Sequence, residues 1–315
     1  RGIFLYEKNY RWIDSKYLGI SIDKSGFDAN NSLWRIWFMM GILTHKGCSN
    51  VGEIFSRDGF VCPITVMSES DASRYRRQLE EAETRFGECD DFRLGLRRYS
   101  NLLLPFVDEI TRKPEIIDII AEILGPNLLV LDAPFFIKEP KTKSFVSWHQ
   151  DLHYWGLETE EEVTAWIALS PATIESGCMR FVAGSQDQCI DHRDTNDTDN
   201  LLTRGQEMLI KVDESTATDA ELAAGQMSIH HGRVFHASYP NKSDDRRIGI
   251  AIRYIPTHAR QVSGNEMSAM LVRGEDRFGN FSLCHRPSEV MGERDIKQWS
   301  KIASARNAVM MEGQS

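Results

Sequence analysis

The spacing of hydrophobic positions along the chain changes near residue 125. Between residues 53 and 125, apolar side chains recur at intervals of three and four residues, which is typical of helices that bury one face. After residue 125 they form short β-rich runs separated by turns of Gly, Pro, Asn and Asp. Helices followed by strands indicate an α+β fold with a mainly β core, in which the helices pack on one face of the sheet.

Three helices are expected in the first part, after a short strand at 60–64. Ser68 is the expected N-cap of the first helix, because its hydroxyl can accept a hydrogen bond from the first turn. Apolar residues follow it at helical spacing: Tyr75, Leu79, Ala82 and Phe86. A second helix is expected over 102–110, and a third from Pro114 to its stop at Gly125.

The second part contains β-rich runs with no helical pattern between them, which favours an antiparallel sandwich or barrel. The chain after Pro256 is expected to be irregular and then helical around 295–311, and these helices flank the β core on its C-terminal side. The predicted strands cover 127–137, 144–149, 163–169, 179–182, 207–212, 227–229, 234–237 and 247–255.

The domain boundaries follow from these patterns. Residues 1–52 are rich in aromatics but lack a clean period, so we expect an N-terminal extension with a helix near 32–43. It is either an irregular surface arm or a cover for a site. Residues 53–262 are expected to form the main domain, and residues 263–315 to pack on it as an irregular and helical segment.

Composition and charge narrow the function. The chain has 315 residues and a formal net charge of -9, which argues against nucleic-acid and membrane partners. The six cysteines contain no Cys-x-x-Cys pair, so we expect reduced thiols in a cytoplasmic protein. We expect the protein to be a monomer or a homodimer. No stretch of about 18 apolar residues suggests a membrane span. Arg76 and Glu83 belong to a charged cluster that is interpreted as a solvated helix face.

Two histidines and an aspartate carry the chemistry. On a strand, His149 and Asp151 would point to the same face, as two ligands of one metal must. His236 follows later in the chain, in competition with His230 and His231 for the same role. Two imidazoles and one carboxylate on one side of a metal are typical of non-haem Fe(II) oxygenases, which keep the remaining positions open.

Arg247 follows His236 after a predicted turn at 241–245, so the flanking strands are expected to be antiparallel neighbours. Along the next strand, Arg247, Gly249, Ala251 and Arg253 share one face, while the isoleucines share the other with Arg246 and should face the helices. The arginine face suits a small anionic ligand, because a guanidinium grips a carboxylate with two hydrogen bonds.

These residues stand in motifs that resemble the phytanoyl-CoA dioxygenase family over residues 53–262. The matching runs are Ile137-Lys138-Glu139-Pro140, His149-Gln150-Asp151-Leu152-His153-Tyr154, Thr164-Ala165-Trp166, Gly177 to Ser185, and His236-x-Ser238-x-x-Asn241 with Arg247. The resemblance implies a double-stranded β-helix of the jelly-roll or cupin type. It also implies an oxygenase that uses Fe(II), 2-oxoglutarate and O2. Gln186 departs from the family, where His often follows Gly-Ser, but this position is not a metal ligand.

The resemblance also implies roles for single residues. His149, Asp151 and His236 match the iron ligands. Arg247 matches the residue that binds the distal carboxylate of 2-oxoglutarate, with Ser238 placed to hydrogen-bond it. Trp166 matches a residue of the co-substrate pocket, and Lys138 and Gln150 are further expected pocket residues. Candidate substrate contacts are His153, Tyr154, Arg180 and His231.

The expected reaction is hydroxylation of a C–H bond in a small organic molecule, with release of succinate and CO2. A natural product or a small zwitterionic metabolite is the preferred substrate. Halogenating relatives replace the carboxylate ligand with Ala or Gly, so Asp151 favours hydroxylation. Desaturation, cyclisation and epimerisation remain open, as does a non-catalytic binding or regulatory protein on the same fold.

Overall fold

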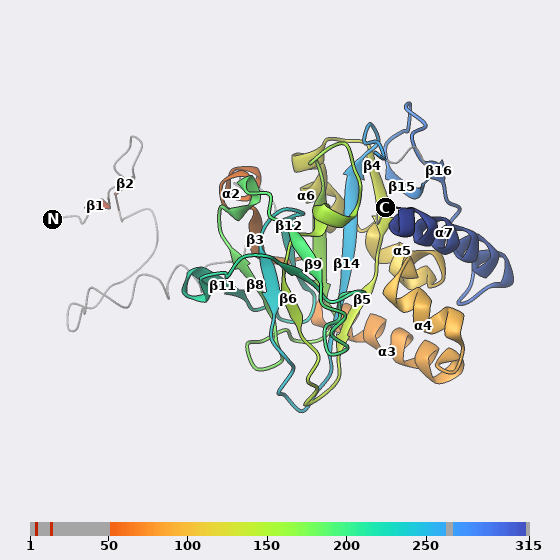
Figure 1. Cartoon of the computed structure of the whole chain (residues 1–315), viewed down its shortest axis with the longest axis horizontal. Helices are drawn as coiled ribbons and strands as arrows, with labels where there is room; N and C mark the ends of the chain where they lie inside the picture. The colour runs from red at the N-terminus through yellow and green to blue at the C-terminus, as the bar shows by residue number, and fades with distance from the viewer. Residues whose placement is uncertain (1–3, 6–12, 15–50, 263–266, 313–315) are drawn as a thin grey trace. The chain divides into compact units, whose positions relative to one another are not determined.

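The computed structural model gives the structure of the chain in four segments (Figure 1). The described residues are 4–5, 13–14, 51–262 and 267–312. Residues 1–49 and 50–315 form two compact units. Within the first, β1 (Phe4–Leu5) pairs antiparallel with β2 (Ile13–Asp14). The helix expected near 32–43 lies outside the described residues.

The three expected helices are observed in the second unit, together with two that were not expected, at Val51–Asp58 and Asp90–Arg97. Ser68 caps the longest of the early helices by accepting a hydrogen bond from the Asp71 amide at 3.0 Å. The second expected helix begins only at Pro105, because Tyr99 adopts a left-handed φ of 58° and a short 3-10 turn follows it. The α-helices are α2 (Val51–Asp58), α3 (Glu69–Phe86), α4 (Asp90–Arg97), α5 (Pro105–Thr111), α6 (Pro114–Leu124) and α7 (Glu293–Glu312), and the 3-10 turns are η2 (Ser100–Leu102), η3 (Asp151–Tyr154), η4 (Ser185–Asp187) and η5 (Glu214–Thr216).

Two sheets form the β core. The larger one has eight strands in the order β16-β15-β4-β14-β7-β12-β3, with β5 also paired to β14, and the smaller one has the order β11-β8-β13-β6. From β5 to β8 and again from β11 to β14, the chain alternates between the two sheets. The strands are β3 (Phe60–Thr65), β4 (Leu128–Asp132), β5 (Phe135–Lys138), β6 (Val146–His149), β7 (Val163–Ala168), β8 (Met179–Val182), β9 (His192–Asp194), β10 (Gln206–Met208), β11 (Ala217–Ala220), β12 (Gln226–His231), β13 (His236–Ser238), β14 (Arg247–Pro256), β15 (Ser268–Arg273) and β16 (Ser282–Leu283).

Several strand predictions need correction. The single strand expected over 127–137 is two strands, β4 and β5, which are separated at Ala133-Pro134, where the proline has no amide to donate to a ladder. The segment after Pro256 is not wholly irregular, because β15 pairs with β4 inside the larger sheet. The short strands β9, β11 and β16 were not expected, since they lack an apolar alternation.

The turn at 241–245 does not join neighbouring strands. β13 lies in the smaller sheet and β14 in the larger one, so this segment crosses from one sheet to the other. The expectation of an antiparallel hairpin around it was therefore wrong. Arg247 therefore lies on the larger sheet, opposite His236, and not on a strand adjacent to that of His236.

The two faces of β14 separate the core into layers. Ile248, Ile250 and Ile252 pack in one hydrophobic cluster with side chains of α3 and α6, as the alternation predicted. The opposite face carries small residues, and Ala251 packs with Trp166 and with Phe181 of the smaller sheet. Gly249 also lies on this face. The position requires glycine, because a Cβ there would lie 2.0 Å from the Trp166 ring.

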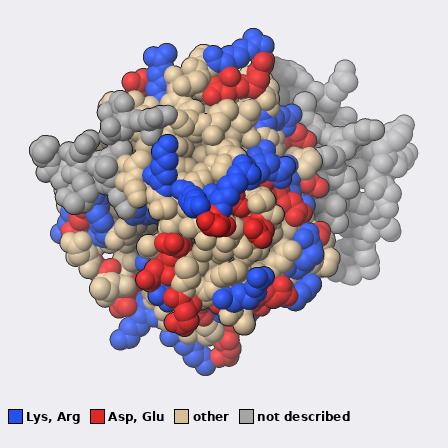
Figure 2. All heavy atoms as spheres, turned by 90° about the vertical axis from the view of Figure 1, so that its right-hand side faces the viewer, with Lys and Arg blue, Asp and Glu red and all other residues tan. Residues whose placement is uncertain are grey.

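Figure 1 shows α3, α4, α5 and α7 gathered on one side of the strands. On this side of the molecule, acidic and basic side chains are intermixed over the surface (Figure 2). No helix among the described residues is both long and apolar enough to span a membrane. The described cysteines are free thiols, as expected: Cys62, Cys89, Cys178, Cys189 and Cys284.

Candidate active site

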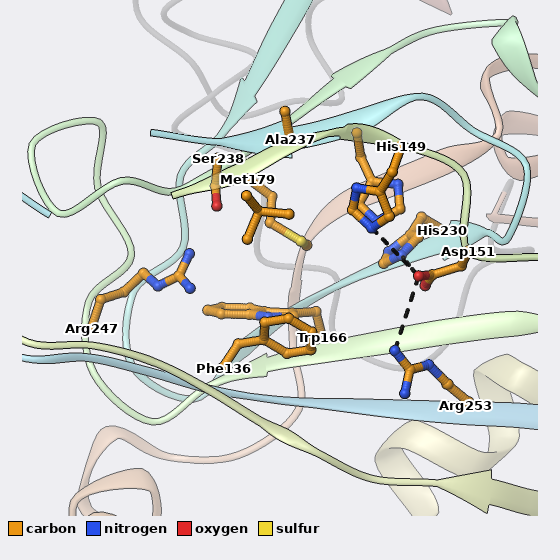
Figure 3. A pocket seen from close by; sticks show the side chains of 12 residues that line it. Phe136, His149, Asp151, Trp166, Met179, His230, Ala237, Ser238, Arg247 and Arg253 are labelled. Atoms are coloured by element: carbon orange, nitrogen blue, oxygen red, sulfur yellow. Dashed lines mark ion pairs between the residues drawn. The ribbon is translucent and has the colours of Figure 1, made fainter. Parts of the chain in front are cut away.

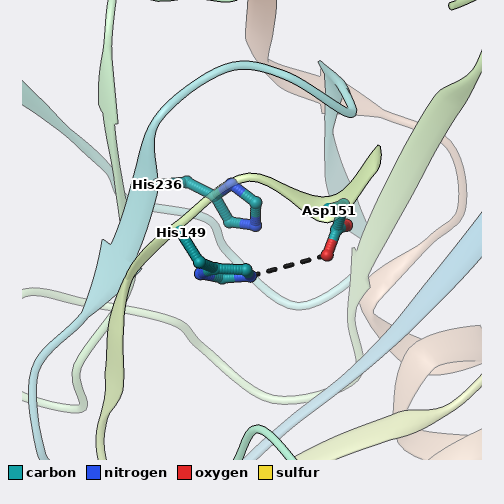
Figure 4. Close-up of side chains that lie close together, drawn as sticks. All are labelled: His149, Asp151 and His236. Atoms are coloured by element: carbon teal, nitrogen blue, oxygen red, sulfur yellow. Dashed lines mark ion pairs between the residues drawn. The ribbon is translucent and has the colours of Figure 1, made fainter. Parts of the chain in front are cut away.

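The two sheets bring His149, Asp151 and His236 together. His149 ends β6 and His236 begins β13, and the two residues are direct partners across the ladder, with ring centroids 4.0 Å apart. Asp151 opens η3, and its Oδ1 lies 3.5 Å from Nε2 of His149. One potential ligand atom from each residue lies within 4.8 Å of the other two (Figure 4).

His149 and Asp151 lie close together, as predicted, but not for the predicted reason. The strand ends at His149, so Asp151 does not share a strand face with it. Instead Gln150 is extended and η3 begins at Asp151. This turn of the chain directs the Asp151 carboxylate toward the imidazole of His149.

Hydrogen bonds orient both imidazoles toward the same point. Nδ1 of His149 lies 2.9 Å from the carbonyl of Ser147, and Nδ1 of His236 lies 3.0 Å from the carbonyl of Val234. Each Nδ1–H therefore donates to the backbone, which leaves the Nε2 lone pair free to bind a metal. Burial, together with His149 and His230, keeps the pKa of His236 well below its usual value, so this imidazole is neutral.

The carboxylate is ionised as a ligand must be. Burial works against ionisation of Asp151, but the positive charge of Arg253 and the neighbouring imidazoles outweigh it and hold its pKa well below the usual range. Two imidazoles and one carboxylate are a donor set that suits Fe(II) among the first-row metals. The residues present thus fit a mononuclear iron site.

A narrow pocket of about 30 Å³ lies beside these residues (Figure 3). Arg247 stands at the end of the pocket away from Asp151, with Trp166, Phe136 and Met179 between them. The remaining lining residues are Val146, His149, His230, His236, Ala237, Ser238 and Arg253. The pocket therefore has a metal-binding end and a cationic end joined by an apolar middle.

Arg247 is a buried cation with little to satisfy it. One guanidinium nitrogen, Nη1, donates to the carbonyl of Gly177 at 2.8 Å, whereas Nε has no hydrogen-bond partner among the described residues. Its guanidinium lies 5.1 Å from the centre of the Trp166 ring. Burial lowers the pKa of Arg247 to about 10, so it stays charged at neutral pH.

Lys138 supports the same end of the pocket from behind. It is the partner of Arg247 across the β5–β14 ladder, and its Nζ donates to Ser238 Oγ at 2.7 Å and to the carbonyl of Tyr239. Burial and the nearby Arg247 lower the pKa of Lys138 to about 5. Lys138 does not line the pocket itself, but it holds the Ser238 hydroxyl that does.

Other residues selected from the sequence lie outside the pocket wall. Gln150 ties loops together: its side-chain amide donates to the carbonyls of Gln188 and Arg233 at 2.7 and 2.6 Å. His153 is exposed, and its ring lies near that of His192 in a tilted arrangement, with ring centroids 4.3 Å apart. Tyr154 belongs to η3, and its side chain is outside the described part.

The two remaining candidate substrate residues do not line this pocket. His231 faces Phe55, with ring centroids 6.2 Å apart, and its neighbour His230 lines the pocket in its place. Arg180 pairs with Glu214 at 2.7 Å and with Asp219 at 3.0 Å. It lines a second cavity of about 880 Å³, which shares Val146, Ala237 and Ser238 with the pocket.

Sequence reasoning considered His230 only as an alternative ligand to His236, and it gave no role in the site to Arg253, Phe136, Val146, Met179 or Ala237; all six line the pocket. For Arg253 a signal was present. It lies an even number of residues after Arg247 on the same strand, so both side chains point to the inner face. The apolar residues carried no signal that distinguishes a pocket wall from an ordinary core.

Two β-sheets that hold two imidazoles and a carboxylate between them define a β protein with a candidate site for a single metal ion. A family comparison agrees with this class: the phytanoyl-CoA dioxygenase (PhyH) profile matches residues 55–249, which is more than half of the chain. The chain therefore belongs to the phytanoyl-CoA dioxygenase family.

Individual relatives extend this result. A probable alpha-ketoglutarate-dependent hypophosphite dioxygenase of Stutzerimonas stutzeri is 29% identical over 178 residues, which cover 54% of this chain and 60% of that protein. The solved structure of the non-heme monooxygenase ThoJ in its apo form is 30% identical with a TM-score of 0.76, and the match covers 83% of this chain and 98% of ThoJ.

A more distant structure supports the fold alone. CytC3 with Fe(II) and alpha-ketoglutarate is 21% identical with a TM-score of 0.57, over 76% of this chain and 93% of CytC3. The chain spans 45% to 60% of the length of the curated relatives that it matches.

Proposed function

We propose that this protein is an Fe(II)- and 2-oxoglutarate-dependent oxygenase built on a double-stranded β-helix. The alternation of the chain between the two sheets supports the fold. The observation that carries the function is the pairing of a metal donor set with a buried, unbalanced cation across one pocket. A metal site alone would be compatible with many chemistries, but Arg247 adds a requirement for an anion beside the metal.

The roles of the ligands follow from their geometry. His149 and His236 would bind iron through Nε2, and Asp151 through Oδ1, the oxygen that faces His149. When bound, Fe(II) with 2-oxoglutarate supplies the activation of dioxygen and the oxidation of a C–H bond. The protein keeps the site dry, since all three ligand side chains are buried.

The cationic end would receive the distal carboxylate of 2-oxoglutarate. Arg247 presents its guanidinium to the pocket, and Ser238 presents a hydroxyl that Lys138 holds in place. Trp166 supplies a flat wall beneath the guanidinium. Because the pocket is narrow, the co-substrate must displace a side chain, and Met179 is suited to yield because its unbranched thioether has several rotamers.

We propose hydroxylation of a small organic molecule as the reaction, with a natural product or a small zwitterion as substrate. The presence of Asp151 supports hydroxylation over halogenation, which needs that ligand position open. Desaturation, cyclisation and epimerisation use the same cofactors and differ only in how the substrate is held. The intact metal donor set together with the buried Arg247 argues against a non-catalytic role.

An anaerobic titration tests this proposal. Apo-protein is loaded with Fe(II) and then titrated with 2-oxoglutarate, and the weak visible charge-transfer band of the chelate is recorded. We expect a saturable band that is absent in His149→Ala. Iron binding without a band would contradict the role of Arg247 and favour the non-catalytic protein, and absence of iron binding would refute the metal site.

A further inference from the structure

His230 is the most unusual polar side chain of the pocket. It lies in the middle of the core on β12 with 1% of its surface exposed, and it lines the pocket beside the three proposed ligands. Neither ring nitrogen has a hydrogen-bond partner among the described residues. Buried polar groups are nearly always hydrogen-bonded, so an unpartnered imidazole that is aimed at a metal-binding pocket calls for a function.

The two oxygens of Asp151 face different partners. Oδ1 faces Nε2 of His149 at 3.5 Å, whereas Oδ2 faces Nε2 of His230 at 3.9 Å. Figure 3 shows His230 beside the carboxylate. Closing the second gap to a hydrogen bond of ~3.0 Å requires a movement of about 1 Å by the carboxylate.

The His230 ring is held in this position by its neighbours. Its centroid lies 4.7 Å from that of His236 and 5.2 Å from that of Phe181. On the other side of the carboxylate, Nη2 of Arg253 lies 4.0 Å from Oδ1. Arg253 is itself fixed, since its Nη1 lies 3.4 Å from Oδ2 of the buried Asp132.

We propose that His230 is a positioning residue, which donates a hydrogen bond from Nε2 to Oδ2 of Asp151 and so presents Oδ1 alone to the metal. This inference rests on the proposed function, because it assigns His230 to the metal that Asp151 binds. With Oδ2 occupied by His230, the carboxylate cannot turn both oxygens to the metal. The coordination positions needed by the co-substrate and dioxygen therefore stay open.

The test measures metal binding, not turnover. Co(II) is titrated anaerobically into apo-protein, and its dissociation constant and visible d–d spectrum are recorded without 2-oxoglutarate. His230→Leu removes the hydrogen-bond donor and replaces the imidazole with an apolar side chain of similar length. We expect it to weaken Co(II) binding by about 10- to 100-fold, the usual cost of losing a hydrogen bond to a metal ligand. His230→Gln restores an N–H and should recover most of that loss.

A matched control lies on the same strand. Ser228 is buried, shares the inner face of β12 with His230, and has an Oγ without a hydrogen-bond partner among the described residues. Ser228→Ala removes a buried polar group without touching Asp151, so Co(II) binding should stay at the wild-type value. A loss as large as that of His230→Leu would overturn the proposal in favour of general damage to the core.

A double-mutant cycle separates positioning from direct ligation. In an Asp151→Ala background, His230→Leu should have no further effect on the Co(II) dissociation constant, because His230 acts only through the carboxylate. A further loss in that background, with an altered d–d spectrum, would make His230 a ligand in its own right and overturn the proposal. If His230→Leu does not fold, His230→Met carries the same cycle.

The two proposals fail in different ways. Unchanged Co(II) binding in His149→Ala would refute the metal site itself. Loss of binding in His149→Ala with wild-type binding in His230→Leu would refute only the positioning role.

Discussion

The two ends of the pocket hold one arginine each, and their surroundings differ. Both arginines come from the inner face of β14. Arg253 has carboxylates at hand, with Asp132 at 3.4 Å and Asp151 at 4.0 Å. Arg247 has no ion pair among the described residues, and its ladder partner is another base, Lys138.

This difference indicates a structural role for Arg253 and a ligand-binding role for Arg247. A buried cation with carboxylate partners has its charge balanced within the fold, so Arg253 can brace Asp151 and the end of β4. A buried cation without such a partner is unfavourable in the free protein and becomes favourable when an anion arrives. The unbalanced end is therefore the one expected to bind the co-substrate.

The largest effect on stability is expected from Arg253→Met. The substitution keeps the length of the side chain but leaves two buried carboxylates without their cation, which typically costs ~3–5 kcal/mol. Urea unfolding of the apo-protein at pH 7 measures this loss. Stability equal to the wild type would show that the Arg253 end is not an internal charge balance.

Arg247→Met should have the opposite signature. We expect affinity for 2-oxoglutarate to fall by about 100-fold, which corresponds to ~2.7 kcal/mol, because a charge-assisted contact to a carboxylate is lost. The unfolding free energy of the apo-protein should not fall, since an unbalanced buried charge is removed. The measurement is the Fe(II) chelate band as a function of 2-oxoglutarate, with Arg246→Ala as its control.

Lys138→Met should stabilise the apo-protein by roughly 1–3 kcal/mol at pH 7. The pKa of Lys138 falls from 10.5 to about 5 on folding, so the unfolded chain binds more protons between these values. Stability of the wild type therefore rises with pH across that window, by at most ~1.4 kcal/mol per pH unit from this group. Urea unfolding at pH 6 and pH 8.5 should show the advantage of the variant shrinking as pH rises, and a constant advantage would contradict a neutral lysine.

The smallest effect is expected next to Arg247 in the sequence. Arg246 points to the helical side, where its guanidinium pairs with Glu83 at 2.8 Å and with Glu139 at 2.9 Å near the surface. Arg246→Ala should cost less than ~1 kcal/mol and leave 2-oxoglutarate affinity unchanged. Weaker co-substrate binding in this variant would mean that charge in the region, rather than the Arg247 position, attracts the anion.

Patterns that depend on near neighbours in the chain were predictable. Ser68 and Pro114 mark helix starts because capping involves residues within one turn, and both starts are observed. The alternation along β14 was visible because successive side chains on a strand point to opposite faces. The resemblance of the His149 and His236 motifs to a known family supplied the candidate ligands and the cofactors.

Contacts between distant segments were not predictable in this way. Glu83 and Arg76 were interpreted as a solvated helix face, yet they pair with Arg246 and Asp245 of the segment that crosses between the sheets. The partner of an ion pair more than 150 residues away leaves no local pattern in the sequence. For the same reason the role proposed for His230 could not be separated from that of His231 beside it.

The sequence by itself thus determined the change from helices to strands, the two faces of β14 and the residue types of the candidate donor set, because each depends on local periodicity or on a motif. Only the tertiary structure decided which histidine faces Oδ2 of Asp151 and which of the two inner arginines lies beside carboxylates. Both depend on how two sheets stack, and stacking brings together side chains whose separation along the chain carries no information about their contact.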